Sequence, residues 1–308
     1  MAHLLRSQSA ITPTHQGGIV TIGNFDGVHK GHQALLAQLT QEAKARGVPS
    51  TVVTFEPHPV EFFAGHALKV ARLTRLREKI TALRACGVDQ VLVLRFNADL
   101  AKLSPDQFIQ KVIVRYLKPN KMIVGDDFRF GYKREGDIET LTALGKQHDF
   151  AVEAMPTFIL QDERVSSTRL RAALAVDDQA LVRSLLGRAY TMQGRVQHGN
   201  QLGRTLGFPT ANIALHRRLS PIRGIYVVYM NGMAGVASLG TRPAVKGTTM
   251  LLEVHLLDFA GDIYGQPVTV EFCKKLRDER DFAHLAALKA QIAQDVRDAR
   301  DYFERTLS

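Results

Sequence analysis

The chain contains no tryptophan and only two cysteines among its 308 residues. Cys86 and Cys273 lie far apart, and neither has a CxxC partner, so the sequence encodes neither a disulfide framework nor a cysteine-built zinc site. No apolar stretch approaches the roughly 18 residues that a membrane-spanning helix needs. The N-terminus also lacks the extended apolar segment of a secretory signal. We therefore expect a cytoplasmic protein that has no membrane partner.

Acidic residues are fewer than basic ones, 30 against 40, which gives a formal net charge of +10. A basic excess is often the footprint of a nucleic-acid-binding protein. Here the excess is spread over both halves of the chain, and aromatic residues make up only 7%, so no basic stripe is interleaved with stacking rings. This even spread suits anionic small ligands such as nucleotides, and we expect no nucleic-acid partner.

The length and the patterning predict two domains, 1–186 and 187–308. In the first, short β-branched runs alternate with helical patterns, which indicates βαβ units and a doubly wound parallel sheet of the Rossmann-like kind. One predicted helix follows Gly31 and places Leu35, Leu36, Leu39 and Ala43 on a single face. Ligands of such sheets bind beyond the carboxyl ends of the strands.

The second domain has closely spaced short strands separated by Gly, Pro, Asn and Asp, a pattern typical of a small antiparallel β-barrel or sandwich. From Phe282 to Leu307 the pattern becomes helical. Apolar residues recur there at intervals of three and four, so we expect a C-terminal helix that lies on the barrel. The expected contacts are Leu285, Leu288, Ile292, Val296 and Phe303.

A glycine-rich turn over 23–32, GNFDGVHKGH, directly follows the first predicted long strand and opens a helix. Free backbone N–H groups and the positive end of a helix dipole make such a turn an anion site. His29 and His32 can both point toward an anion there, each donating from two nitrogens when protonated, and Gly31 permits close approach. The alternative is that one histidine caps the helix and the other is a surface residue. The position at the end of a parallel strand favours the anion site.

Hydroxyls and arginines come together in the segment VSSTRLR, 165–171. Such hydroxyls are often helix caps, and first-turn arginines are often solvated. Cations at the positive end of a helix are unfavourable, however, so a bound polyphosphate explains Arg169 and Arg171 better.

Two further loops, FEPHP at 55–59 and GDDFRFG at 125–131, follow strands and should line the ligand crevice. Phe128 and Phe130 could stack on a flat ring, and Asp127 could bind a polar edge. Alternatively, the two phenylalanines only cover the end of the sheet.

In the second domain, the segment 199–212 has glycines at four-residue intervals before a Pro-Thr-Ala-Asn turn. Thr210 and Asn212 offer hard oxygen ligands for Mg²⁺. The segment could also be a flexible hairpin loop. On the strand 249–259, Glu253 and His255 face the same side, so Glu253 could serve as a general base or could simply lie on a solvated face.

These motifs together carry a family resemblance. GNFDGVHKGH, TFEPHP, GDDFRFG and VSSTRLR resemble the FMN adenylyltransferase module of the prokaryotic bifunctional riboflavin kinase/FAD synthetase family, itself within the nucleotidylyltransferase superfamily. GRTLGFPTAN, GIYVV, GVASLGTRPAV and LLEVHLLDFAGDIYG resemble the riboflavin kinase module of the same family. The resemblance implies an enzyme that phosphorylates riboflavin to FMN and adenylylates FMN to FAD, with ATP and Mg²⁺ for both steps and with FMN and FAD as ligands.

The resemblance also implies roles for individual residues. His29, His32 and Glu253 would be catalytic, with Glu253 as base toward the riboflavin hydroxyl, and Thr210 and Asn212 would bind the metal. The ATP and phosphate ligands would be Gly23, Asn24, Phe25, Gly31, Ser167, Thr168, Arg171, Gly203, Gly207, Thr210 and Asn212. The flavin contacts would be Asp127, Phe128, Phe130 and Arg277.

Two other functions compete with this one. The first domain could adenylylate a different phosphorylated acceptor while the barrel serves only as a lid. Alternatively, the chain could be a nucleic-acid module or a regulatory flavin-binding module. The sequence permits an oligomer without predicting one.

Overall fold

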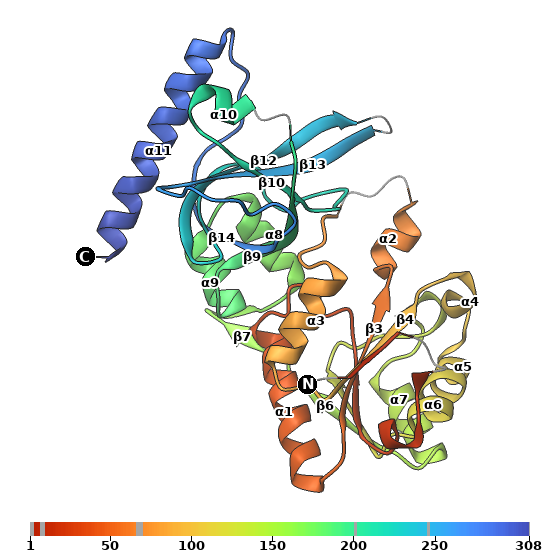
Figure 1. Ribbon diagram of the computed structural model, residues 1–308. Helices are drawn as coiled ribbons and strands as arrows, with labels where there is room; N and C mark the ends of the chain where they lie inside the picture. Colours follow the sequence, from red (N-terminus) through yellow and green to blue (C-terminus); the bar gives the residue numbers. More distant parts are fainter. Residues whose placement is uncertain (1–2, 7–9, 66–69, 200–201, 245–246, 308) are drawn as a thin grey trace. The chain divides into compact units, whose positions relative to one another are not determined.

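The computed structural model describes residues 3–6, 10–65, 70–199, 202–244 and 247–307 (Figure 1). The chain divides into two compact units, one made of Met1–Val70 and Thr74–Ser167, the other of Ala71–Leu73 and Thr168–Ser308. The sequence pattern divides the chain later, at 186/187. The difference arises because the two helices between these points group with the second unit.

The first unit is built on a six-stranded sheet in which every neighbouring pair is parallel. Its strand order is β1-β4-β3-β2-β5-β6. The strands are β1 (His3–Leu5), β2 (Ile19–Ile22), β3 (Ser50–Glu56), β4 (Gln90–Arg95), β5 (Lys121–Gly125) and β6 (Ala151–Met155). The predicted doubly wound parallel sheet is confirmed. Its order changes direction at β2, which lies between β3 and β5, and the carboxyl end at such a point is where α/β sheets bind ligands.

Helices cover both faces of this sheet, and two buried clusters lie between the layers. Neighbouring residues on β5 point to opposite clusters, since Met122 and Val124 join one and Ile123 the other. This is why parallel strands have continuous apolar sequences. The helices are α1 (Lys30–Arg46), α2 (Pro59–Ala64), α3 (Leu76–Ala85), α4 (Ala98–Ala101), α5 (Pro105–Phe108), a π-helical segment (Ile109–Val114), α6 (Arg115–Leu117) and α7 (Ile138–Gln147).

The helix α1 ends at Gly47, which has a left-handed φ of 65° and thereby terminates the helix without strain. Its predicted apolar face is confirmed: the buried residues are Leu35, Leu36, Leu39 and Ala43. A small antiparallel hairpin, β7 (Ile159–Leu160) with β8 (Glu163–Arg164), completes the first unit.

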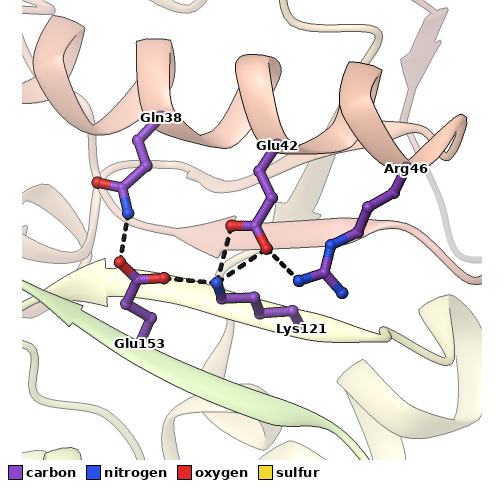
Figure 2. Close-up of polar contacts among 5 residues, drawn as sticks. All are labelled: Gln38, Glu42, Arg46, Lys121 and Glu153. Atoms are coloured by element: carbon purple, nitrogen blue, oxygen red, sulfur yellow. Dashed lines mark hydrogen bonds and ion pairs between the residues drawn. The ribbon is translucent and has the colours of Figure 1, made fainter.

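A polar network ties α1 to β5 and β6 (Figure 2). The amine of Lys121 lies 2.7 Å from a carboxylate oxygen of Glu42 and 2.5 Å from one of Glu153. Gln38 donates to Glu153, and Arg46 pairs with Glu42. The hydrogen bond from Lys121 lowers the pKa of Glu42. The Lys121 side chain is only 13% exposed, and removing it would leave the carboxylates of Glu42 and Glu153, which are 20% and 38% exposed, without the cation that separates them.

The second unit contains a closed antiparallel barrel of six strands, ordered β10-β13-β12-β11-β14-β9. The predicted barrel is confirmed. The strands are β9 (Tyr190–Gln197), β10 (Ala211–Ala214), β11 (Gly224–Met230), β12 (Met233–Ala244), β13 (Gly247–Leu256) and β14 (Pro267–Arg277). Its helices are α8 (Ser167–Ala175), α9 (Gln179–Leu186), α10 (Leu202–Leu206) and α11 (Leu285–Leu307).

The helix α11 packs on the barrel as the spacing predicts, with Phe303 and Ala299 buried among barrel residues and Val296 partly buried beside them. Leu285 is an exception, since it is 58% exposed. It is the first residue of the helix, beyond the turns that contact the barrel, so the prediction was wrong there.

The tripeptide Ala71–Leu73 is held within the second unit by hydrogen bonds to its carbonyls. Arg217, only 7% exposed, donates to the carbonyl of Arg72 at 2.8 Å, and the Tyr190 hydroxyl donates to that of Leu73 at 2.8 Å. Arg171 donates from Nε to the Ala71 carbonyl at 2.7 Å. A piece of chain far from the barrel in sequence is thus part of its unit.

Candidate functional sites

A crevice of about 340 Å³ opens at the carboxyl ends of β2 and β5 in the first unit, where the sheet order predicts a ligand. The sequence-predicted residues that line it are Gly23, Asn24, Phe25, His29, Gly31, His32, Asp127, Phe128 and Ser167. Motifs separated by more than a hundred residues therefore meet in one cavity.

His29 is the N-cap of α1, and its Nδ1 accepts a hydrogen bond from the backbone N–H of His32 at 3.3 Å. Because that nitrogen accepts, the proton of the neutral ring is on Nε2. The two imidazoles stack with their centroids 3.6 Å apart and their planes 14° apart. The sequence left open whether His29 is a helix cap or an anion ligand. The structure shows that it caps the helix and also lines the crevice.

Both histidines are held in the neutral form. Burial, followed by the charge of Arg164, lowers the pKa of His29 to about 4. Burial, followed by the neighbouring His29, lowers the pKa of His32 well below its ordinary value. The expectation of imidazolium rings that donate from both nitrogens therefore does not describe this pair, in which His29 presents one N–H. The Nδ1 of His32 is buried and has no hydrogen-bond partner among the described residues.

The turn before α1 has a strained backbone, and hydrogen bonds from residues outside the turn stabilise it. Phe25 and Val28 have positive φ angles of 47° and 45°, which is costly for a β-branched residue such as Val28. Asp26, 2% exposed, accepts from the backbone N–H of Thr74 at 2.9 Å, and the Thr74 hydroxyl in turn accepts from Gly27 N–H at 3.0 Å. The Ser167 hydroxyl donates to the Asp26 carbonyl at 2.8 Å. These contacts hold the turn in its strained shape.

Of the two phenylalanines in this loop, one lines the crevice and the other lies in the core. Phe128 lines the crevice, whereas Phe130 is 6% exposed and belongs to the buried cluster beneath it. The rings stack at 5.4 Å with 13° between their planes. Phe130 therefore supports Phe128 from below, and a direct contact of Phe130 with a flavin, as predicted, would require it to leave the core.

Arginines contribute the cationic wall of the crevice. Arg164 on β8 pairs with Asp127, and Arg129 lies 2.9 Å from Asp137. Arg134 also lines the cavity. The sequence analysis did not single out any of these three arginines. Arg129 belongs to the motif GDDFRFG and could have been recognised there. Arg164 lies on β8, and a two-residue strand is too short to give a periodic signal.

The predicted phosphate ligands Thr168 and Arg171 lie on α8 in the second unit. Arg171 donates from Nε to the Ala71 carbonyl, so part of its guanidinium already has an acceptor. Their part in holding a phosphate stays a prediction.

A second cavity, of about 380 Å³, is formed by the barrel and α11. Four predicted residues line it: Gly203, Thr210, Glu253 and Arg277. The predicted residues Gly207 and Asn212 do not line it, but Asn212 is the direct strand partner of Glu253 across β10 and β13. Glu253 also pairs with Ser238 on β12, another lining residue. Glu253 is half-buried and lines this cavity, and its role as a base stays a prediction.

Glycines let the Pro209–Asn212 turn pack tightly. A Cβ on Gly203 would lie 2.4 Å from the Phe208 carbonyl and 3.2 Å from the Thr210 hydroxyl. A Cβ on Gly199 would lie 2.2 Å from the Asn212 amide nitrogen. Any other residue at either position would displace the two side chains predicted to hold a metal.

His255 anchors the same turn to β13. Its Nδ1 lies 2.8 Å from the Pro209 carbonyl, and its ring meets Phe208 edge-on with centroids 5.5 Å apart. A carbonyl only accepts, so His255 Nδ1 carries the proton and donates. Since His255 is two residues from Glu253 on one strand face, this bond fixes the turn relative to Glu253.

Arg277 forms an ion pair with a buried carboxylate. Its Nε and Nη2 donate to the two oxygens of Asp295 at 2.9 and 2.7 Å, and Asp295 is only 3% exposed. Its guanidinium also lies 5.8 Å from the Phe282 ring centroid. This forked pair joins β14 to α11 across the cavity wall, which explains why an arginine stands there whether or not it meets flavin.

Comparison with known proteins matches the two sites to two families. The FAD synthetase family model matches residues 11–169, and the riboflavin kinase family model matches residues 186–303. The bifunctional riboflavin kinase/FMN adenylyltransferase of Escherichia coli strain K12 is 49% identical over 296 residues, covering 94% of each chain. The Pseudomonas fluorescens protein of the same name is 48% identical and covers 96% of each.

The chain belongs to the bifunctional riboflavin kinase/FMN adenylyltransferase family. A Streptococcus pneumoniae crystal structure, titled a macrolide-efflux protein, is also similar over nearly the whole chain. It has 29% sequence identity and a TM-score of 0.78, and covers 97% of this chain and 98% of its own.

The family membership and the cavities agree in position. The crevice falls within the FAD synthetase match, and the barrel cavity falls within the riboflavin kinase match. The resemblance and the two activities expected from the sequence are thereby confirmed. Among the described residues, no helix is both long and apolar enough to cross a membrane.

Proposed function

We propose that the barrel cavity phosphorylates riboflavin to FMN and that the crevice of the first unit adenylylates FMN to FAD with release of pyrophosphate. ATP supplies the phosphoryl group in one step and the adenylyl group in the other. The functional domains are 1–186 and 187–308, as the pattern predicts. A cytoplasmic location and the absence of a nucleic-acid partner stay predictions, as does the oligomeric state.

In the crevice, an oxygen of the FMN phosphate attacks the α-phosphorus of ATP, a P–O bond forms, and the bond to the β-phosphate breaks. The stacked histidines support this role, because the Nε2 proton of His29 can donate to phosphate oxygens in a buried setting where hydrogen bonds are strong. Since no side-chain nucleophile is required, catalysis rests on positioning and on stabilising charge. Anionic oxygens close to the rings would raise the lowered pKa values again, so substrate binding should be accompanied by proton uptake.

The other predicted ligands divide between the two substrates. Asp127 and the face of Phe128 are the candidate flavin contacts. Gly23, Asn24 and Gly31 are the candidate phosphate contacts, and of these Gly31 lies in the first turn of α1, whereas the backbone N–H of Gly23 already donates to the Val53 carbonyl. Ser167, Thr168 and Arg171 would hold the departing pyrophosphate.

In the barrel cavity, Glu253 is the candidate base for the riboflavin 5′-hydroxyl. The proton moves to its carboxylate while the hydroxyl oxygen bonds to the γ-phosphorus of ATP and ADP departs. The chain fits Mg²⁺ here, since Thr210 and Asn212 present oxygen donors beside Glu253, and Mg²⁺ usually takes few protein ligands along with phosphates and water. Bound in this way, Mg²⁺ would neutralise charge on the transferred phosphate. His255 holds the turn in register for this geometry.

The observation that carries the proposal is that two separate cavities each gather the residues of one family motif set. The test is to incubate the protein with riboflavin, ATP and Mg²⁺ and to separate the flavins by chromatography. FMN should appear first and FAD should follow. If riboflavin stays unmodified while a different phosphorylated acceptor is adenylylated, the barrel is not a riboflavin kinase and the assignment fails.

A further inference from the structure

A third cavity lies in the first unit and shares no lining residue with the crevice. Its volume is about 590 Å³, larger than either candidate active site. The end of β4, the loop into α4, and the helical run from the π-helical segment 109–114 into α6 form its walls. Small-molecule sites commonly fall in this size range.

Four cations line this cavity: Arg6, Arg95, Lys111 and Arg115. Asp99 is its one lining carboxylate among the described residues. No salt bridge or hydrogen bond joins the side chains of these four cations to any described residue. Arg115 instead lies 5.7 Å from the ring centroid of its neighbour Tyr116.

Three other cations of the same unit behave differently. Lys121, Arg129 and Arg164 each have a carboxylate partner. All four cations that line the cavity are exposed to solvent, which screens much of their mutual repulsion, and a bound anion would offset the remainder. The net charge of the lining thus favours a ligand with more than one negative charge.

The floor of the cavity is apolar. Leu94 on β4 is 4% exposed and Val112 of the π-helical segment is 3% exposed, and both side chains belong to the same buried cluster. Leu100 and Leu103 add partly buried side chains. A cationic rim above an apolar floor suits a molecule that carries an anionic group on an apolar or flat body, and a simple inorganic anion would leave the floor unfilled.

The π-helical segment provides a second, independent observation. Single π-helical turns are rare and occur frequently at functional sites, since the wider turn sacrifices regular α-helical hydrogen bonding. Here the segment supplies both a cation, Lys111, and part of the floor, Val112. The unusual backbone therefore shapes this cavity.

We propose that this cavity is an auxiliary binding site for a phosphorylated small molecule, whose phosphate lies among Arg95, Lys111 and Arg115 and whose apolar body covers Leu94 and Val112. The proposal does not depend on the chemistry of the two active sites. A nucleotide and a phosphorylated flavin share the required chemistry, so the experiment treats them separately.

The test is arginine labelling by phenylglyoxal, quantified for each peptide by mass spectrometry. The full-length protein is labelled in the presence of FMN, ATP, riboflavin or inorganic pyrophosphate, with sodium chloride added to equalise the ionic strength. Arg95 and Arg115 should be protected several-fold by FMN or by ATP, at concentrations at least tenfold lower than pyrophosphate requires. Arg77, exposed on α3 and outside all three cavities, serves as the internal reference.

A charge-matched pair of variants completes the test. R95A/K111A/R115A should lose one bound FMN or ATP per chain in equilibrium dialysis, whereas K44A/R77A/K146A, which removes the same charge from exposed positions elsewhere, should retain it. Formation of FMN and FAD at saturating substrates is measured in both variants, so a failure of the catalytic assignment appears separately. Equal labelling of Arg95 and Arg115 in all arms, protection by pyrophosphate as strong as by FMN and ATP, or an unchanged stoichiometry in the first variant would overturn the proposal.

Discussion

Replacing His29 by asparagine separates the two roles that the structure gives this residue. As the N-cap of α1, His29 accepts a hydrogen bond from the N–H of His32, and its Nε2 proton is available in the crevice. Asparagine is among the best N-cap residues, so His29→Asn should keep the helix start. It cannot place a donor where Nε2 stands. Alanine at the same position would lose both functions and cost about 1 kcal/mol of stability.

The expected loss of activity follows from removing one donor to a phosphate that gains charge in the transition state. Such donors contribute about 2.7–4 kcal/mol, so kcat for adenylylation should fall roughly 10²- to 10³-fold. Riboflavin phosphorylation should stay unchanged, because Glu253 and its cavity share no residue with the crevice.

The same variant should also change how stability depends on pH. Burial lowers the pKa of His29 to about 4 in the folded protein, whereas in the unfolded chain it is near 6.5. Between these values the unfolded state binds more protons, so stability decreases as the pH falls from 6.5 toward 4. The full effect is about 3 kcal/mol, and His29→Asn should remove it.

The assay follows both products by chromatography, starting from riboflavin and separately from FMN, together with urea unfolding at pH 7 and pH 5. Three results would refute this reasoning: normal FAD formation in His29→Asn, loss of both activities with the fold intact, or an unfolding transition whose pH dependence equals that of the unchanged protein.

Glu253→Gln should reduce FMN formation from riboflavin about 10²- to 10⁴-fold while supplied FMN is still adenylylated; equal loss of both products would contradict it. His255→Ala should lower kinase kcat/KM about 2- to 12-fold, and His255→Asn, which restores an N–H donor toward Pro209, should recover most of it; identical kinetics of the two variants would exclude the positioning role. Lys121→Met should lower the free energy of unfolding in urea by about 1–3 kcal/mol, whereas Arg46→Ala, which removes an exposed partner of the same network, should cost under about 0.5 kcal/mol.

Periodicity in the sequence was enough to predict both architectures, because each long strand and helix carries its own apolar pattern. The short elements carry too few residues for such a pattern, and β1, β7, β8 and β10 were accordingly missed. The π-helical segment was also missed, since its backbone differs from an α-helix by one residue per turn and leaves no mark in composition.

The candidate sites were predicted where motifs directly follow strands, which is how His29 and Asp127 were found. The burial of Phe130 and the neutral state of His29 depend on packing by segments distant in sequence, so no local pattern encodes them. The donor role of His255 depends on the Pro209 carbonyl 46 residues away and could be recognised only in three dimensions.

The tripeptide Ala71–Leu73 has a practical consequence for anyone dissecting the protein. Its carbonyls are the acceptors for Arg171, Tyr190 and the nearly buried Arg217. Cutting the chain after Ser167 to obtain the barrel alone would remove these acceptors from all three donors, and cutting after Leu186 would remove them from Tyr190 and Arg217. A stable isolated kinase fragment would therefore need a replacement for the Ala71–Leu73 carbonyls. Apolar residues at 190 and 217 would remove the need for these acceptors.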